Sequence, residues 1–484
     1  MTNPLSTDLT VGLVRTPTAT YEAGHEPVRM RALLARLGET LGWSDGARGA
    51  LGRLIRPGDR VLLKPNWVLH RNNAGLGTDE LITHHSLIVA AAEAALAAGA
   101  ARVLVGDAPV QGCDFERMLA LGDLRSWEAT LRAREPRFAG LRDFRRTVIT
   151  RPGDVGSAVR ERVELDEFVL FDLGRESLLE PVSDGAPFRV TMYPQELMER
   201  THAPGRHQYL VAREVIAADV VINLPKLKTH KKAGVTCALK NLIGINGNKE
   251  FLPHHRIGGS GTGGDCYPGA NPLKRLLESA LDRRNSVSAS PSAIRRWDAL
   301  ARVLDRTVRR LGDRMEVEGS WSGNDTIWRT CLDLNRILLY GRLDATLAPE
   351  RQRRVINLVD AIIIGHGNGP LSPEPSPFGL LLGSTSSAAT DHVSALLLGY
   401  DPARIPITRH AFDAFEYPLA PAGTATIPVV GDLGSGNADD LLSDFVAPFT
   451  EVTYPLGWLD AVHPRWSERA RGSDVPQVRA EPAA

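Results

Sequence analysis

Lysine is rare in this chain, and most of it lies in one segment. Of the 57 lysine and arginine residues only eight are lysines, and six of these fall between Lys226 and Lys249. Lysine is a compact, flexible charge whose pKa shifts readily, whereas arginine is a planar fork that stays charged. A chain that otherwise uses arginine is expected to keep lysine where arginine cannot replace it. The segment therefore predicts an anion-binding site or an amine with a shifted pKa, with a solvated basic loop as the alternative.

The order of residues within this segment favours convergence. Lys226, Lys228 and His230 alternate, so on an extended segment all three are expected to point to one side. Converging N–H donors bind phosphate or carboxylate. Neighbouring ammonium groups also lower one another's pKa, and a lysine near neutrality can act as a base or form a Schiff base. The predicted catalytic residues are Lys226, Lys240, His230 and Asp360.

Two further strands are expected to bring polar residues to the same site. The apolar run 61–63 ends at Lys64-Pro65-Asn66, where proline, which has no N–H group, interrupts a sheet. The run 102–105 leads into Asp107. Ligands bind beyond the carboxyl ends of strands in open α/β sheets. The predicted substrate-binding residues are Lys64, Asn66, Asp107, Lys228, Thr229, Asn241, Lys249, Asn324 and Arg329.

A divalent metal is a second hypothesis for this region. Imidazole and carboxylate ligands suit such an ion, and the candidate ligands are His255, Asp265 and Asp325. The alternative is that these side chains hydrogen-bond a polar substrate. The four cysteines are far apart, so their spacing predicts no iron–sulfur cluster and no zinc site. Walker and Rossmann glycine patterns are absent, so neither ATP nor NAD is predicted.

The elements that must position these residues alternate between strands and helices. Helical spacing of apolar residues is seen at 28–43, 86–98, 328–339 and 388–398, and apolar strand-like runs occur at 11–15, 219–223, 354–364 and 378–382. A strand, a helix and a strand in succession imply parallel pairing. We therefore predict an α/β fold with mixed, mostly parallel sheets flanked by helices, forming one region over residues 1–466. Within it we expect lobes at about 10–205 and 206–460, a helical insertion at 272–318, and then a polar tail at 467–484.

Charge and hydropathy exclude several classes of partner. The formal net charge is zero and the pI is near 7.2, which disfavours general binding to nucleic acid. The longest apolar stretch, 87–105, is interrupted by Glu93 and Arg102, so no membrane span is predicted. The N-terminus lacks a secretory pattern, and a cytoplasmic location is expected. The sequence does not fix an oligomeric state.

Several motifs in order resemble one family. The chain resembles the domain-of-unknown-function 362 (DUF362) family over residues 10–460. Four motifs carry this resemblance: Val61-Leu-Leu-Lys64-Pro-Asn66, Leu224-Pro-Lys226-Leu-Lys228-Thr-His230, Leu239-Lys240-Asn241-Leu-Ile-Gly244 and Gly367-Asn-Gly-Pro370. Stretches near residues 254–268 and 323–335 are similar to a long form associated with polysaccharide and specialised-metabolite gene clusters. The resemblance also implies a distant architectural similarity to nickel-pincer lactate racemases. Some members carry a four-cysteine iron–sulfur insert, which this chain lacks.

The resulting functional hypothesis is an enzyme acting on a small anionic substrate. A lysine-rich site without a cofactor motif favours proton abstraction by an isomerase, epimerase or lyase. Sugar phosphates, nucleotide sugars and acidic metabolites are the expected substrates. The alternatives are a non-catalytic binding protein of a biosynthetic system and a nucleic-acid binder, against which the neutral charge counts.

Overall fold

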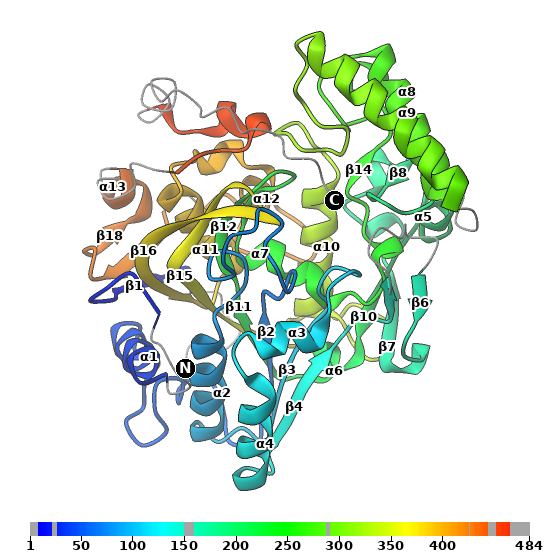
Figure 1. The fold of residues 1–484 in the computed structure, drawn as a ribbon. Coiled ribbons are helices and arrows are strands. Elements are labelled where there is room, and N and C mark those ends of the chain that lie inside the picture. The colour runs from blue at the N-terminus through cyan, green and yellow to red at the C-terminus, as the bar shows by residue number, and fades with distance from the viewer. Residues whose placement is uncertain are drawn as a thin grey trace.

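One large mixed sheet organises the molecule. The computed structural model describes residues 8–21, 27–149, 159–286, 291–424, 426–443 and 452–464, so the predicted polar tail lies outside the described residues. The long path of the sheet, in spatial order, is β18 (Gly436–Asn437), β17 (Pro428–Gly431), β1 (Val11–Arg15), β16 (Ser372–Ser384), β15 (Arg354–Asn368), β11 (Val220–Leu224), β2 (Arg60–Pro65), β3 (Arg102–Asp107) and β4 (Phe138–Asp143). Strands from both predicted lobes therefore pair in one sheet (Figure 1).

The centre of the sheet is parallel, as the sequence predicts. β15, β11, β2, β3 and β4 run in the same direction, whereas β15 and β16 form a long antiparallel hairpin. β12 (Lys226–His230) pairs in parallel with β15 and turns back into β13 (Gly234–Thr236). The α/β fold class with a mostly parallel sheet is thus confirmed. The hairpin is the main difference, because the short run 378–382 is only part of the longer strand β16.

Helices cover both faces of the sheet. Alternating strand residues divide between two cores: Val61 and Leu63 pack with one face, and Leu62 packs with the other. The first face holds α1 (Val28–Thr40), α2 (His85–Ala97), α3 (Phe115–Ala120) and α4 (Leu124–Arg134). The opposite face holds α6 (Arg213–Ala217), α7 (Ala238–Asn241), α10 (Ile327–Tyr340), α11 (Ser387–Leu397), α12 (Pro406–His410) and α13 (Ala438–Ser443).

Smaller sheets and a helical hairpin complete the fold. The remaining elements are β5 (Thr147–Ile149) with β6 (Val159–Glu161), β7 (Phe168–Asp172) and β9 (His202–Ala203) on either side of β10 (Arg206–Ala212), β8 (Phe188–Arg189) with β14 (His255–Arg256), and α5 (Gln195–Thr201).

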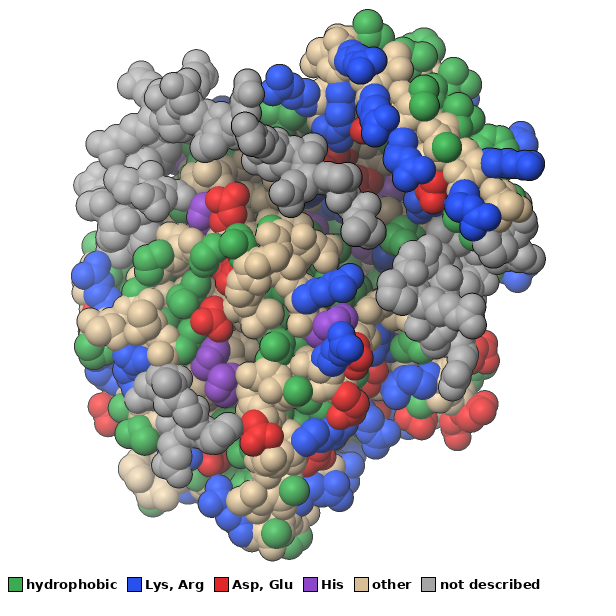
Figure 2. Space-filling model, in the orientation of Figure 1, with side chains coloured by type: hydrophobic (Ala, Val, Ile, Leu, Met, Phe, Trp, Pro, Cys, Tyr) green, Lys and Arg blue, Asp and Glu red, His purple; other side chains and the backbone are tan. Residues whose placement is uncertain are grey.

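Two helices, α8 (Pro272–Ser286) and α9 (Pro291–Arg310), lie in the segment where the sequence predicts a helical insertion. The pair stands at a corner of the molecule, with a row of basic side chains along it (Figures 1 and 2). None of the described helices has the length and apolar character needed to cross a bilayer.

Candidate functional site

A cavity of about 400 Å³ lies at the carboxyl ends of the central strands. Pro65 ends β2 and Asp107 ends β3, and the two strands are parallel neighbours, so the residues that follow them reach the same edge of the sheet. The opposite wall comes from the end of β12, from α7 and from residues 249–254. Seven of the predicted site residues line this cavity, namely Lys64, Asn66, Asp107, His230, Lys240, Asn241 and Lys249.

A buried ion pair forms one wall. Lys64 Nζ lies 2.7 Å from Asp107 Oδ1, and both side chains are almost fully buried. Burial raises the pKa of the Asp107 carboxyl to about 6, against the opposing effect of Lys64, so the carboxyl is mostly ionised at pH 7. Burial lowers the pKa of Lys64, and Asp107 opposes that shift. Lys64 is therefore neutralised by its partner and is not free to bind a second anion.

Lys228 lies behind this wall. Its amine donates to Asn66 Oδ1 at 2.9 Å and to the carbonyl oxygen of Leu81, and the side chain has no exposed surface. Burial, and then Lys226 and Lys240, keep its pKa well below the usual lysine value. Lys228 thus orients Asn66 and does not itself line the cavity.

Lys226 and Asp360, two predicted catalytic residues, form a separate cluster. Their charged groups are 3.1 Å apart, and neither side chain is exposed. The Tyr21 hydroxyl accepts from Lys226 at 2.5 Å and donates to Asp360 at 2.5 Å. Thr229 is also away from the cavity, since its hydroxyl donates to the Gly367 carbonyl.

Alternation along β12 predicts that Lys226, Lys228 and His230 lie together, but in the structure they do not. A strand rises about 3.3 Å per residue, so Lys226 and His230 are separated by roughly 13 Å along β12. Only the end of the strand reaches the cavity, and His230 alone of the three lines it. A shared strand face therefore did not give a shared site.

The two carboxylates among the predicted metal ligands, Asp265 and Asp325, are committed to other contacts. Asp265 accepts from the Thr326 hydroxyl at 2.6 Å and from Arg256 Nε at 3.2 Å. Asp325 pairs with Arg329 at 3.1 Å. Within the described ranges, no group of three or more His, Cys, Asp or Glu side chains could hold a metal ion. The candidate set is corrected accordingly, because arginines already neutralise both carboxylates.

Asn324 and Arg329, predicted to bind substrate, are structural neighbours of the cavity. The Asn324 amide donates to the carbonyl oxygens of His254 at 2.9 Å and Gly319 at 2.8 Å. Arg329 donates to the Leu178 carbonyl and pairs with Asp325. Neither side chain lines the cavity, but Asn324 holds the backbone of a residue that does.

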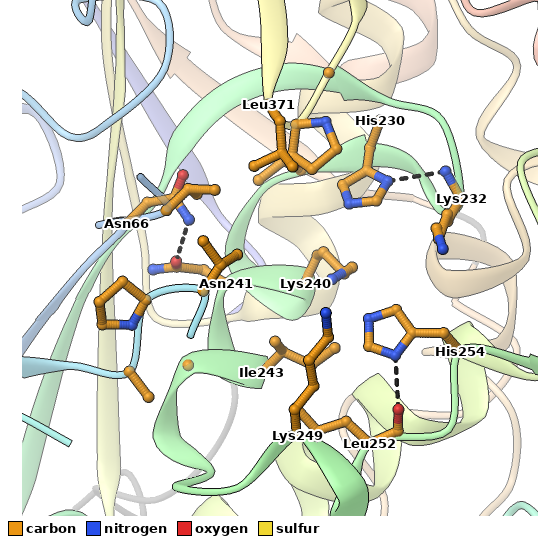
Figure 3. A pocket seen from close by; sticks show the side chains of 18 of the residues that line it. Asn66, His230, Lys232, Lys240, Asn241, Ile243, Lys249, Leu252, His254 and Leu371 are labelled. Carbon is orange, nitrogen blue, oxygen red and sulfur yellow. Dashed lines mark hydrogen bonds between the residues drawn. The ribbon is translucent and has the colours of Figure 1, made fainter. Parts of the chain in front are cut away.

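Two lysines of the cavity have no acidic partner in the part of the chain that the structure describes. Lys231 and Lys232 pair with Glu316 and Glu318 respectively. Lys240 and Lys249 have no such ion pair, and Figure 3 shows their amines directed toward the same space. Burial, and then Lys232, lower the pKa of Lys249 to about 8; burial is also the main cause that lowers the pKa of Lys240. These two amines are the positive charge available to a ligand.

Two histidines face the lysines with opposite hydrogen-bonding capacity. His254 Nδ1 lies 2.6 Å from the Leu252 carbonyl oxygen, so Nδ1 carries the proton and Nε2 is an acceptor. His230 Nδ1 accepts from the backbone N–H groups of Lys232 at 3.0 Å and Ala233 at 3.2 Å. The proton of His230 is therefore on Nε2, which is a donor.

Both rings are neutral near pH 7. Burial, and then the charges of Lys240 and Lys228, keep the pKa of His230 well below its usual value. Burial, and then Lys232 and Lys240, do the same for the pKa of His254. A neutral imidazole with an open Nε2 can accept a proton at physiological pH, and its lowered pKa makes it a weaker base than a free histidine.

The residues predicted from the sequence do not include His254; they include its neighbour His255, as a metal ligand. His255 is 1% exposed, and neither of its ring nitrogens has a hydrogen-bond partner in the described structure. Adjacent residues of an extended segment face opposite ways. This alternation predicts that only one of the two histidines faces the cavity, but it does not identify which one.

Comparison with known proteins supports the family resemblance. Residues 172–395 match the family described as "Domain of unknown function (DUF362)", which confirms the predicted resemblance over that range. A thylakoid-associated protein of Synechocystis sp. is 24% identical over 386 residues, which cover 80% of this chain and 74% of the relative. A crystal structure of a Thermotoga maritima protein aligns with 10% identity and a TM-score of 0.33. That alignment covers 78% of this chain and 60% of the Thermotoga chain. These matches do not show the expected similarity to lactate racemases.

Proposed function

We propose that this protein, whose DUF362 region holds the lysine cluster, is an enzyme that abstracts a proton from carbon in a small anionic substrate. One observation carries the proposal: the open Nε2 of His254 faces the same cavity as the two lysines that lack acidic partners. The lysines hold the anionic group, and the neutral imidazole is the base. The reaction is that of an isomerase or a lyase.

The reacting groups have distinct roles. His254 Nε2 takes the proton from the carbon next to a carboxylate or carbonyl, and the electron pair of the broken C–H bond moves toward the oxygen. Lys240 and Lys249 balance the negative charge that develops there. The N–H of His230 Nε2 donates to the same oxygen.

The hydrogen bonds of His230 limit what it can do. Because its Nδ1 already accepts two backbone N–H groups, loss of the Nε2 proton would leave an anionic ring. His230 therefore stabilises charge, and His254 itself returns the proton to another atom of the substrate or to a leaving group. A single base suits an isomerase or a lyase. An epimerase would need a second base on the opposite face, for which Lys240 is the candidate.

The wider setting belongs to the same proposal. The resemblance to the long form of the family supports a role in polysaccharide or specialised-metabolite biosynthesis. A cytoplasmic location stays a prediction from the sequence. The local excess of lysine, in a chain of zero net charge, favours small anions over nucleic acid as ligands.

Deuterium exchange tests the proposal without knowledge of the full reaction. The protein is incubated in D₂O with a panel of sugar phosphates, nucleotide sugars and carboxylic acids, and proton NMR follows the hydrogen on the carbon next to the carbonyl or carboxylate. At least one compound should exchange, and His254→Gln should slow that exchange by on the order of a hundredfold or more. The control is His392→Gln, in a half-buried histidine on α11 that pairs with Asp439.

The alternative outcomes are distinct. If compounds bind but none exchanges in the parent protein, the chain is a non-catalytic binding protein. If His254→Gln exchanges as fast as the parent, another group is the base. The open Nε2 of His254 would then no longer support the proposal.

A further inference from the structure

The polar side chains at the ends of β2 and β3, and Asn241 beside them, have little hydrogen-bonding capacity left. Asn241 Oδ1 accepts from Asn66 at 2.8 Å and from Lys64 at 3.2 Å. Its Nδ2 donates to Asn223 Oδ1 and to the Lys64 carbonyl. All four bonds that an asparagine amide can make are therefore used within the protein.

The neighbouring groups are committed as well. The Lys64 amine donates to Asn241 and to the Pro65 carbonyl, and it pairs with Asp107. These three contacts use the three protons of the ammonium group. Asn66 accepts from Lys228 and donates to Asn241. Lys64, Asn66, Asp107 and Asn241 therefore offer little hydrogen bonding to hydroxyl groups of a ligand, and burying an unpaired hydroxyl costs free energy.

Apolar side chains occupy the space beside these satisfied groups. Figure 3 shows Leu371 on one side of the cavity and Ile243 on the other. The remaining apolar part of the lining includes Trp67, Val68, Pro109 and Val110. Such a surface favours hydrocarbon, because contact with a ligand removes apolar area from water on both sides.

The two lysines without an acidic partner and the two histidines lie together at the opposite end. Lys240, Lys249, His230 and His254 come from α7, residues 249–254 and the end of β12, and their side chains converge (Figure 3). The cavity therefore has one cationic end, which holds the base, and one apolar end.

Resting on the proposed function, we infer that the substrate is an amphipathic acid: one carboxylate or phosphate on a largely apolar body. Its anionic group binds Lys240 and Lys249, and its body lies between Leu371 and Ile243, beside the half-buried Val68 and Val110. Nucleotide sugars, with several hydroxyl groups and two phosphates, match this lining poorly. Sugar phosphates also match this lining poorly, because they carry several hydroxyl groups. Of the substrate classes expected from the sequence, acidic metabolites therefore fit best.

Isothermal titration calorimetry with matched probes tests the inference. The probes are 3-phenylpropionate, phenyl phosphate, acetate, inorganic phosphate, glucose 6-phosphate and UDP-glucose. We expect each aryl compound to bind at least tenfold more tightly than the small anion with the same charged group. Glucose 6-phosphate should bind no more tightly than inorganic phosphate. Comparing 3-phenylpropionate with phenyl phosphate then identifies the preferred anionic group.

Two substitutions locate the binding mode. Leu371→Asn should weaken binding of the aryl probes at least fivefold and leave inorganic phosphate unchanged, whereas Lys249→Met should weaken every anion. The matched control is Leu170→Asn, in an exposed leucine on β7 that does not line the cavity.

Tighter binding of glucose 6-phosphate or UDP-glucose than of the aryl probes would overturn the inference and leave the proposed function standing. Loss of aryl binding in Leu170→Asn to the same extent as in Leu371→Asn would also overturn it. Absence of binding by every anion, together with absence of deuterium exchange, would remove the proposed function as well.

Discussion

At the scale of single residues, the partner of each Nδ1 atom separates the roles of the two cavity histidines. A carbonyl oxygen fixes the proton of His254 on Nδ1, and two backbone N–H groups fix that of His230 on Nε2. Two side chains of one type thus become an acceptor and a donor in one cavity. The sequence shows both histidines but neither tautomer, because the deciding contacts depend on local backbone geometry.

Lys249 gives a pH-dependent prediction. Its pKa of about 8 means that the amine loses its charge within the accessible range. Affinity for a probe anion such as phenyl phosphate should therefore fall as pH rises through about 8. Lys249→Arg should remain charged and move this loss to higher pH, since arginine is not deprotonated in proteins. Calorimetric titrations at pH 6.5, 7.5, 8.5 and 9.5 would measure the shift, and equal pH profiles would contradict the assignment.

Lys240 allows its charge to be separated from any chemical role. If this lysine only balances negative charge, Lys240→Arg should bind probe anions within about fivefold of the parent, and Lys240→Met should bind at least tenfold more weakly. Deuterium exchange measured on the same proteins completes the comparison. An arginine variant that binds normally but no longer exchanges would make Lys240 a base and would support epimerisation.

At the scale of elements, a glycine after α7 allows the buried ion pair to form. A Cβ atom at Gly244 would lie 2.0 Å from Asp107 Oδ1 and 2.7 Å from Lys64 Nζ. Gly244→Ala should therefore separate Lys64 from Asp107 and destabilise the protein by about 1–3 kcal/mol. Urea unfolding would measure this change. The control is Gly112→Ala, at an exposed position where a Cβ would meet nothing within 4 Å and where stability should stay within about 0.5 kcal/mol.

Elements with strong local signals were predictable. Pro65 marks the end of β2, and helical spacing identifies α2 and α10 to within about two residues. Parallel pairing then brings Asn66 and Asp107 to one edge of the sheet. The cationic end was less predictable because long-range bonds place it: the His254 N–H donates to the Arg189 carbonyl, and Asn324 binds the His254 carbonyl. Local periodicity carries no information about such contacts.

At the scale of the whole molecule, the cavity depends on segments far apart in the chain that share one sheet. α11 connects the cationic end to this framework, because Asp391 on α11 accepts from the Leu239 N–H at 3.2 Å, at the start of α7. α7 carries Lys240. The buried Asp391 carboxyl is more than 150 residues from Lys240 along the chain, and it supports the helix on which this lysine lies.

This carboxyl should make stability depend on pH. Burial raises the pKa of Asp391 to about 7, although hydrogen bonds from the α7 backbone oppose the shift, and its Oδ2 has no partner within the described structure. Between about pH 4 and pH 7 the unfolded chain has released this proton while the folded chain retains it. The free energy of unfolding should therefore fall as pH rises across that window, by on the order of 4 kcal/mol, and change little above it.

Asp391→Asn separates this contribution from those of other buried acids. The amide cannot ionise, so the difference in unfolding free energy between variant and parent should shift in favour of the variant from pH 5 to pH 8. Urea unfolding at pH 5, 6, 7 and 8 would measure it, with Asp460→Asn, an exposed carboxyl, as the control whose difference should not change. Parallel pH profiles for Asp391→Asn and the parent would show that Asp391 is ionised throughout. In that case an ionised Asp391 carboxylate would accept the hydrogen bond at the start of α7. Any pH dependence of anion binding could then be assigned to the cavity lysines, because Asp391 would not change the stability of the fold with pH.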